Sequence, residues 1–313
     1  METYLGLDLG GTKLLIGEVD KHGNILRFKK YASGYFNQQA ASEIIKSSLD
    51  DYIRTVGWVE SKPVSMGIGL IGRVDPNKGI WLQIDPNRTQ PIELAKEIGE
   101  IYGISCRIDN DVKSATRAER VWGVGQFSKN FIYINIGTGI AVGTVVNGRQ
   151  IRGSHFNAGE AGHMTVGVNV GVECCCGRKD CVEAIASGSG FDSCARLLKD
   201  KYETRLEIPQ DEGVKVDVRE VIRLCQDGDP LCRVLVENAT TGIANLIMNL
   251  VRLTDPDTVV LGGSIVADEY IFEKILNKLN HNTMRFVSNG VVITKLNPQF
   301  VGLLGAAAVA MDM

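Results

Sequence analysis

The sequence lacks the features that mark several broad classes of protein. It has no basic tract and a net charge of −3 over 313 residues, so its composition does not support nucleic-acid binding. No run of 18 apolar residues occurs, so neither a transmembrane helix nor a membrane partner is expected. The first residues, Met1-Glu2-Thr3, lead directly into a strand pattern without a signal peptide. We therefore expect a cytoplasmic protein.

Cysteine is present, and its context decides how it is interpreted. Eight cysteines in a chain of this length, without a secretion signal, favour free thiols and metal ligation over a disulfide framework. The hydrophobic content of 44% and the charged content of 23% are ordinary for a soluble protein. The length is compatible with about two domains, each able to bury its own core.

Strand and helix patterns alternate along the chain, which predicts an α/β fold. Strands are expected at residues 4–8, 14–19, 25–31, 64–70, 104–108, 131–136, 258–261 and 290–294. Helical spacing or capping signals are found at residues 44–56, 91–101, 115–121, 217–224, 230–253, 268 onward and 302–311. A shift of 126 positions aligns Gly11-Thr12 with Gly137-Thr138 and Gly17 with Gly143. This weak repeat suggests two related α/β domains, although two glycine-rich hairpins can also resemble each other by chance.

Two glycine turns are candidate phosphate-binding loops. Asp8 ends the first strand and is followed by the turn Leu9-Gly10-Gly11-Thr12-Lys13, whose backbone N–H groups would face an anion. Asp8 could hold Mg²⁺ through water. The motif is not a P-loop, because no Gly-Lys-Ser/Thr opens a helix. A hairpin turn with a structural aspartate is the alternative, but the second turn, Gly137-Thr138-Gly139, favours phosphate binding.

Two further strand ends carry candidate functional residues. Asp109-Asn110-Asp111 follows a strand and precedes a helix, where an aspartate can accept a proton from a hydroxyl or cap the helix. We expect Asp109 to be a cap or solvated, and Asp111 to act in chemistry. Gly262-Gly263-Ser264 would let the backbone approach a planar or anionic ligand, although a simple strand-to-helix turn explains it better when the motif is taken alone.

A cluster of histidine, cysteine and acidic residues lies between Gly159 and Glu183. His163, Cys174, Cys176 and Cys181 have the types and number of ligands for a tetrahedral zinc site. A closed set of four ligands indicates a structural site, and unligated cysteines in a tight loop are the alternative. Glu160 and Glu183 lie within three residues of these ligands. We therefore expect the metal ligands and the two acids to belong to a single site.

Together these motifs resemble the ROK family (repressor, open reading frame, kinase) of bacterial sugar kinases. The resemblance covers nearly the whole chain. It rests on residues 8–13, Asn110-Asp111, residues 137–139, the run Ala158-Gly159-Glu160-x-Gly162-His163, and the block from Cys174 to Glu183. It implies an actin-like, hexokinase-type α/β fold of two domains flanking a cleft. The expected domains are residues 1–113, to which a C-terminal helix at about 300–313 returns, and residues 114–299.

The resemblance also implies an activity, namely ATP-dependent phosphorylation of a sugar hydroxyl, usually the 6-hydroxyl of a hexose. It makes Asp111 the general base and gives ATP, Mg²⁺ and a structural Zn²⁺ as cofactors. A homodimer is implied as well. The sugar-binding residues implied are Asn87, Asn110, Glu160, His163 and Glu183; the zinc ligands are His163, Cys174, Cys176 and Cys181. ATP would contact Asp8, Gly10, Gly11, Thr12 and Lys13 in one loop, Gly137, Thr138 and Gly139 in another, and Gly262 and Gly263 at the adenosine.

Departures from the family pattern gather near the expected sugar pocket. They are Ile71, Arg73, Arg88, Lys113, Phe156 and Asp180. We interpret them as marks of a sugar other than plain glucose, although Arg73 and Arg88 are more simply explained as surface residues. Gly159 stands where fructokinases of the family often carry proline, which disfavours fructose. The alternatives are a sugar-binding regulator without kinase activity, a fructokinase-type enzyme and, least favoured because its four ligands are saturated, a zinc hydrolase.

Overall fold

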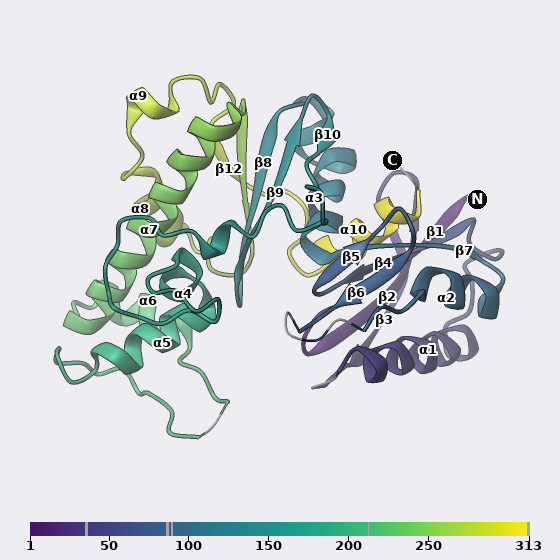
Figure 1. The fold of residues 1–313 in the computed structure, drawn as a ribbon, viewed down its shortest axis with the longest axis horizontal. Coiled ribbons are helices and arrows are strands. Elements are labelled where there is room, and N and C mark those ends of the chain that lie inside the picture. Colours follow the sequence, from purple (N-terminus) through teal and green to yellow (C-terminus); the bar gives the residue numbers. More distant parts are fainter. Residues whose placement is uncertain (35–36, 86–87, 89, 212, 312–313) are drawn as a thin grey trace. The chain divides into compact units, whose positions relative to one another are not determined.

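The computed structural model describes residues 1–34, 37–85, 88, 90–211 and 213–311. The chain forms two compact units, coloured along the sequence in Figure 1. The first unit comprises residues 1–127, 150–158 and 295–313, and the second comprises residues 128–149 and 159–294. These limits differ from the expected division after residue 113, because that position falls inside the continuous helix α3 (Asp111–Trp122).

The first unit is built on a mixed sheet with the strand order β3-β2-β1-β4-β7. The strands are β1 (Thr3–Leu9), β2 (Lys13–Asp20), β3 (Ile25–Ala32), β4 (Ser65–Leu70) and β7 (Ser105–Asn110). The first three form an antiparallel meander, whereas β1, β4 and β7 are parallel, with Leu9 opposite Leu70 and Leu70 opposite Asn110. The carboxyl ends of β1, β4 and β7 therefore meet at one edge, which we call the carboxyl edge.

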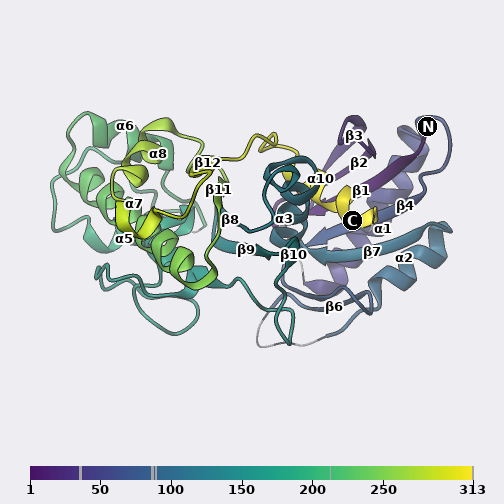
Figure 2. The same ribbon diagram turned by 90° about the horizontal axis from the view of Figure 1, so that it is seen from above.

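Helices cover both faces of this sheet (Figures 1 and 2). They are α1 (Gln38–Thr55), α2 (Leu94–Tyr102), α3, the short η1 (Val124–Gln126) and α10 (Val301–Ala310). One core joins leucines of β1 to Ile45 of α1 and Ile98 of α2. On the opposite face, Ala118 of α3 and Leu303 of α10 pack on β2. A two-stranded hairpin, β5 (Arg73–Asp75) and β6 (Ile80–Gln83), follows β4.

Small residues allow α10 to lie very close to the sheet. A Cβ atom on Gly67 of β4 would collide with the carbonyl oxygen of Ala306, and one on Gly6 of β1 would lie 2.6 Å from the carbonyl oxygen of Leu303. Glycine in these strands is therefore required by backbone-to-backbone packing. The C-terminal helix thus belongs to the core of the first unit.

The second unit repeats the topology of the first. Its sheet has the order β10-β9-β8-β11-β12, in which β8 and β9 are antiparallel while β8, β11 and β12 are parallel. The bounds are β8 (Phe131–Ile136), β9 (Ile140–Val146), β10 (Arg149–Gln150), β11 (Thr258–Gly262) and β12 (Val291–Ile293). The weak sequence repeat therefore corresponds to a real repetition of hairpin, glycine turn and parallel strands.

The helical part of the second unit packs mainly around α7 (Pro230–Thr254). The other helices are η2 (Ala161–His163), α4 (Val182–Ala186), α5 (Gly188–Leu198), α6 (Val218–Gln226), α8 (Glu269–Leu276) and α9 (His281–Met284). By length and composition alone α7 could cross a membrane, although no uninterrupted apolar run identifies it in the sequence. Most of its apolar window is buried in the core, so this single helix is weak support for membrane insertion.

Candidate active site

Asp111 lies at the carboxyl edge of the first unit, as the first residue of α3. The preceding residue, Asn110, is the N-cap, and its side-chain oxygen accepts hydrogen bonds from the backbone N–H groups of Val112 and Lys113 at 3.0 and 3.1 Å. The Asn110 amide nitrogen donates to Asp111 Oδ1 at 2.9 Å and to the Gly72 carbonyl at 3.0 Å. The cap therefore fixes the orientation of the Asp111 carboxylate.

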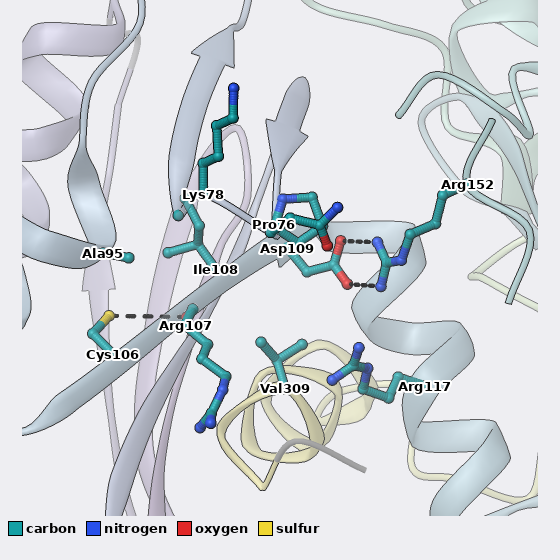
Figure 3. Close-up of a pocket in the computed structure, with 12 residues that line it drawn as sticks. Pro76, Lys78, Ala95, Cys106, Arg107, Ile108, Asp109, Arg117, Arg152 and Val309 are labelled. Atoms are coloured by element: carbon teal, nitrogen blue, oxygen red, sulfur yellow. Dashed lines mark hydrogen bonds and ion pairs between the residues drawn. The ribbon is translucent and has the colours of Figure 1, made fainter. Parts of the chain in front are cut away.

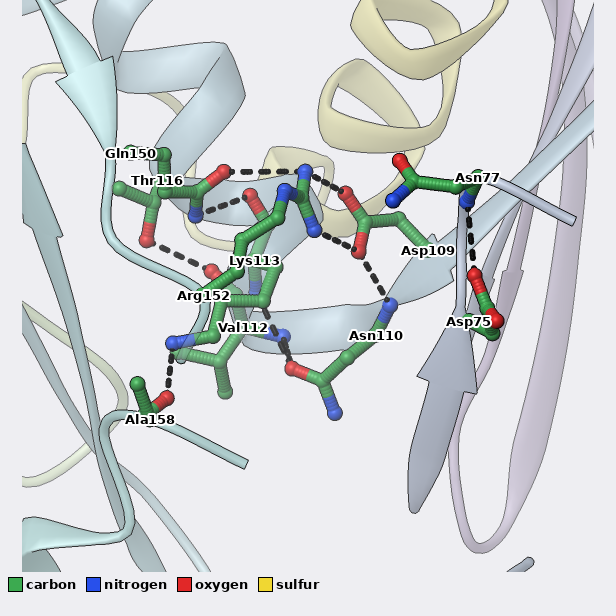
Figure 4. A network of polar contacts seen from close by, with 10 residues as sticks. All are labelled: Asp75, Asn77, Asp109, Asn110, Val112, Lys113, Thr116, Gln150, Arg152 and Ala158. Atoms are coloured by element: carbon green, nitrogen blue, oxygen red, sulfur yellow. Dashed lines mark hydrogen bonds and ion pairs between the residues drawn. The ribbon is translucent and has the colours of Figure 1, made fainter. Parts of the chain in front are cut away.

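Asp109 is neither a helix cap nor solvated, so the expectation for this residue is wrong. It is 1% exposed and forms a two-pronged ion pair with Arg152, with Nη1 to Oδ1 at 2.8 Å and Nη2 to Oδ2 at 2.6 Å (Figure 4). Its Oδ1 also accepts the backbone N–H of Asn110 at 2.9 Å. Burial alone would lower the pKa of Arg152, but the hydrogen bonds and the charge of Asp109 outweigh it and raise that pKa. No local sequence signal marks this pair, because its members are 43 positions apart.

A tight loop carrying Phe156 is tied to the same helix. The Ala158 N–H donates to the Arg152 carbonyl at 3.1 Å, and the buried Lys113 ammonium group donates to the Ala158 carbonyl (Figure 4). Phe156 adopts φ +60°, in the left-handed region where a residue with a side chain is uncommon. Glycine would adopt this conformation without strain, and the phenyl ring of Phe156 is partly exposed.

The turn after β1 lies on the carboxyl edge too. Gly10 donates its N–H to the Lys13 carbonyl at 2.9 Å, and the Ser33 hydroxyl donates to the Gly10 carbonyl at 3.1 Å. Gly11 and Thr12 are exposed. Burial raises the pKa of Asp8 to about 6, partly offset by the charge of Lys13. A Cβ on Gly302, at the start of α10, would overlap the Asp8 carboxylate, so this acid is enclosed on that side.

The glycine turn of the second unit borders a pocket of about 430 Å³. Gly137 and Thr138 accept hydrogen bonds at their carbonyls from the N–H groups of Gly188 and Ser189, at the start of α5. Gly263 adopts φ +97°, and a Cβ there would overlap the Ile136 carbonyl, so Gly262-Gly263 lets β11 turn against the end of β8. The predicted glycines at 137–139 and 262–263 therefore lie close together in the second unit.

Sequence reasoning missed most of the walls of this pocket. The missed walls come from the start of α5, from α6 and the segment leading into it, and from the segment after β11, and they are Gly188, Lys215, Val216, Asp217, Val218, Arg219, Ile222, Ile265 and Asp268. Ser264, of the predicted Gly262-Gly263-Ser264 turn, also lines the pocket. Asp217 was predicted only as part of a capping box and Asp268 only as the approximate start of a helix, and both cap helices in the structure. A cap at the mouth of a pocket gives no separate sequence signal, so only the fold identifies these residues as pocket walls.

Glu160, His163 and Glu183 all lie near the start of β9. Glu183 Oε2 accepts the backbone N–H of Ile140 at 2.7 Å. Glu160 precedes η2 and is exposed, and its carbonyl accepts the His163 N–H at 3.1 Å. A Cβ on Gly162 would collide with the Ile140 carbonyl, so this glycine lets η2 approach β9 closely. Glycine at 162 thereby positions the two acids and the histidine around the same backbone segment.

The predicted metal ligands come together. The ligand atoms of His163, Cys174, Cys176 and Cys181 lie within 4.8 Å of one another. Cys174 Sγ lies 3.4 Å from His163 Nδ1, and Cys176 Sγ lies 3.5 Å from Cys181 Sγ. His163, Cys175 and Glu183 form a second, overlapping group with the same spread of ligand atoms.

Asp180, one of the departures, organises the backbone beside this cluster. It adopts φ +57°, a conformation that glycine reaches without strain, and its Oδ1 accepts the N–H groups of Val170, Gly171 and Val172 at 3.1, 2.8 and 3.0 Å. The hydrogen bonds compensate for the strained backbone. The Asp180 side chain therefore holds the backbone of the neighbouring irregular segment 170–172.

The other residues singled out in the sequence lie outside the groups described above. Asn87 lies outside the described residues. Arg73, in β5, donates to Gln83 Oε1 at 2.7 Å, and its buried Nε has no hydrogen-bond partner among the described residues. Arg88 is exposed, and the Ile71 carbonyl accepts the Trp81 indole N–H at 3.0 Å. Arg73 is thus partly buried rather than a pure surface residue.

Comparison with known proteins gives a consistent assignment. Residues 4–313 match the model of the ROK family. The chain is 26% identical to a glucokinase of Thermotoga maritima, over 98% of this chain and 97% of that one. It is 23% identical to the DNA-binding transcriptional dual regulator NagC of Escherichia coli, over 97% of this chain and 74% of the regulator. A ROK hexokinase structure from Thermus thermophilus matches with a TM-score of 0.77 and 28% identity, covering 99% of this chain and 98% of that one. The predicted actin-like α/β fold is confirmed, and the chain belongs to the ROK family.

Proposed function

We propose that the protein transfers the γ-phosphoryl group of ATP to a hydroxyl of a hexose or hexose derivative. The observation that carries the proposal is the carboxyl edge, where an oriented carboxylate, Asp111, shares one sheet edge with the glycine turn after Asp8. The glucokinase and hexokinase among its relatives support the same reaction class. Phosphoryl transfer depends on positioning and charge neutralisation, which such an edge supplies.

Asp111 is proposed as the general base. Its carboxylate would accept the proton of the attacking sugar hydroxyl, while the Asn110 amide and the Val112 N–H hold it in place. Because these donors are held by the N-cap of α3, the base needs little reorganisation during the reaction. Asn110 would also bind the sugar, as the family resemblance implies.

The nucleotide is assigned to the two glycine turns and the pocket of the second unit. The pocket bordered by Gly137 and Thr138 has a suitable volume for an adenosine, and Lys215 and Arg219 on its wall favour an anionic ligand. Gly262 and Gly263 would lie along the base and ribose. Asp8 and the turn Gly10-Lys13 would meet the terminal phosphates, with Asp8 holding Mg²⁺ through water. The bound metal would neutralise charge on the phosphates.

Glu160, His163 and Glu183 are proposed to hold the sugar hydroxyls, together with Asn87. His163 presents Nδ1 to Cys174, which leaves Nε2 as the ring nitrogen suited to a hydroxyl. Gly159 adopts φ +101°, so the proline that fructokinases of the family often carry would not fit this backbone.

The cysteine-histidine cluster fits a structural zinc ion. A tetrahedral ion with Zn–S bonds of about 2.3 Å separates its ligand atoms by about 3.5–4 Å, and the cluster already has separations of 3.4 and 3.5 Å. His163, Cys174, Cys176 and Cys181 would saturate the ion. Its role would be to fix the loop from which His163 and Glu183 project.

The test is an ATP-consumption assay over hexoses, hexosamines, their N-acetyl forms and β-glucosides, with product analysis to locate the phosphorylated hydroxyl. Turnover is expected with at least one aldohexose derivative. Measurable sugar binding without turnover on any member of the panel would refute the kinase assignment. That result would favour the second candidate, a sugar-binding regulator, which the similarity to the regulator of Escherichia coli supports.

A further inference from the structure

Arg152 joins the loop that carries Phe156 to the strand that leads to the proposed base. Its backbone carbonyl accepts the Ala158 N–H at 3.1 Å and so closes the loop, while its guanidinium group pairs with Asp109 at the end of β7 (Figures 3 and 4). Arg152 therefore connects two parts of the first unit that are far apart in the sequence, and the proposed function assigns it no role.

The Asp109 carboxylate extends this contact to the N-cap of α3. Its Oδ1 accepts Nη1 of Arg152 at 2.8 Å and the backbone N–H of Asn110 at 2.9 Å, and its Oδ2 accepts Nη2 of Arg152 at 2.6 Å. Two parallel hydrogen bonds from one planar guanidinium group fix the orientation of the carboxylate. The Asn110 amide in turn donates to Asp111 Oδ1 at 2.9 Å. A continuous series of hydrogen-bonded neighbours thus leads from Arg152 to Asp111.

The same loop contacts α3 on the other side of Asp111. Gln150 Nε2 donates to the Lys113 carbonyl at 3.0 Å, and the Lys113 ammonium group donates to the Ala158 carbonyl (Figure 4). Nη2 of Arg152 also makes a long contact of 3.4 Å with Gln150 Oε1. The contacts of the loop therefore bracket the proposed base, with one on the residue two positions before it and another on the residue two positions after it.

The geometry of the Arg152 guanidinium exceeds what charge neutralisation requires. Asp109 is 1% exposed, and a buried carboxylate needs a cation beside it, a need that an ammonium group would also meet. A guanidinium group additionally presents two N–H groups in one plane to both carboxylate oxygens. The Arg152 side chain is 21% exposed and lines a cavity of about 440 Å³, so hydrogen bonds rather than close packing hold it on that side (Figure 3).

We propose that Arg152 is a positioning residue for the base: its two-pronged bond to Asp109 holds Asn110, and through Asn110 the carboxylate of Asp111, in the orientation that phosphoryl transfer needs. The effect on turnover rests on the proposed kinase function, whereas the order that Arg152 imposes on the start of α3 does not. A displacement of about 1 Å in a reacting group can lower a rate by about a hundredfold, so the effect is measurable without loss of the fold.

Arg152→Lys is the variant to test, because it keeps a positive charge beside Asp109 and removes the two-pronged geometry. Hydrogen exchange at the amides of residues 110–113 measures order at the start of α3, and single-turnover phosphoryl transfer measures the consequence. We expect faster exchange at these amides, unchanged exchange in α7, and a transfer rate lower by about tenfold to a hundredfold. Affinity for a non-hydrolysable ATP analogue should stay near that of the wild type, because the proposed nucleotide pocket lies in the second unit.

Two further variants separate positioning from stability. Arg149→Lys changes an exposed arginine three positions earlier and is the matched control, which should behave as the wild type in every measurement. The double variant Asp109→Asn/Arg152→Gln removes both charges of the pair, so it leaves no unpaired buried charge, and it replaces Arg152→Lys if that variant folds poorly. Its transfer rate should also be low, because glutamine lacks the guanidinium fork.

Wild-type exchange at residues 110–113 in Arg152→Lys would overturn the link between Arg152 and the start of α3. Faster exchange combined with a wild-type transfer rate would overturn the positioning role. If the wild type phosphorylates no sugar, the kinase assignment fails instead. Hydrogen exchange then decides the link alone: selective loss of protection at residues 110–113 supports it, and unchanged protection refutes it.

Discussion

Replacing Asp8 with asparagine should make the protein more stable at neutral pH and less active. Burial raises the pKa of this carboxyl from 3.8 to about 6, so the folded protein holds its charged form at a cost. Between the two values the native state binds more protons than the unfolded state, and stability falls as pH rises through that window. Above about pH 6 the full cost remains.

The pKa shift sets the expected size of the effect. A shift of about two units corresponds to about 3 kcal/mol at about pH 7.5 and to about 1 kcal/mol at about pH 4.5. Part of the Asp8 side chain stays accessible to water, so these values are ceilings. Asp8→Asn should therefore gain up to about 2 kcal/mol more free energy of unfolding at the higher pH than at the lower one. Comparing the two pH values cancels any packing difference between Asp and Asn.

Urea unfolding at the two pH values measures this directly, and Asp20→Asn is a control of opposite sign. Asp20 accepts hydrogen bonds from His22 and Asn24, which outweigh its burial and lower its pKa. It thus contributes stability at neutral pH that is lost in acid, so Asp20→Asn should destabilise most at about pH 7.5. A stability change in Asp8→Asn that is the same at both pH values, or a wild-type kcat in that variant, would refute the reasoning.

Three further changes test other parts of the account. Cys176→Ser should lose zinc and lower the melting temperature, because metal binding is coupled to folding; elemental analysis giving one zinc per variant chain would contradict this. Phe156→Gly should relax the left-handed backbone and shift kcat/KM among sugars, and an unchanged ranking would place Phe156 outside sugar recognition. Gly67→Ala should lower the free energy of unfolding by at least about 2 kcal/mol, because the added methyl group collides with the backbone of α10. Gly11→Ala is the stability control, since there is open space around Gly11. Equal melting temperatures for the two variants would refute the packing argument.

The parts of the fold predicted best are those that local patterns determine. Most strands of the two sheets and the long helix α7 follow from apolar periodicity and capping chemistry within a few residues. The β5–β6 hairpin was missed because its strands are short, although Asp75 accepts the N–H groups of Asn77 and Lys78 and Gly79 adopts φ +69°. That Asp-Pro-Asn-Lys-Gly turn is a signal that could have identified it.

The residues of the candidate site also fall into two groups, those that a local motif identifies and those that only the tertiary fold brings together. The cysteine cluster and Asn110-Asp111 are contiguous motifs, so the sequence alone brings their members into consideration. The ion pair of Asp109 with Arg152 and the wall of the proposed nucleotide pocket at Lys215 and Arg219 depend on chain segments far apart in sequence. No spacing rule connects such residues, and only the tertiary fold brings them together. The homodimer and the identity of the sugar stay predictions.

The central claim is that Asp111 removes the proton from the sugar hydroxyl. The most direct measurement is the rate of phosphoryl transfer by Asp111→Asn under single-turnover conditions, with sugar affinity measured separately by calorimetry. We predict a transfer rate lower by about 10²–10⁴-fold with sugar affinity within a few-fold of wild type, and wild-type behaviour of the exposed control Asp200→Asn. A transfer rate near that of the wild type would contradict the assignment of Asp111 as the base.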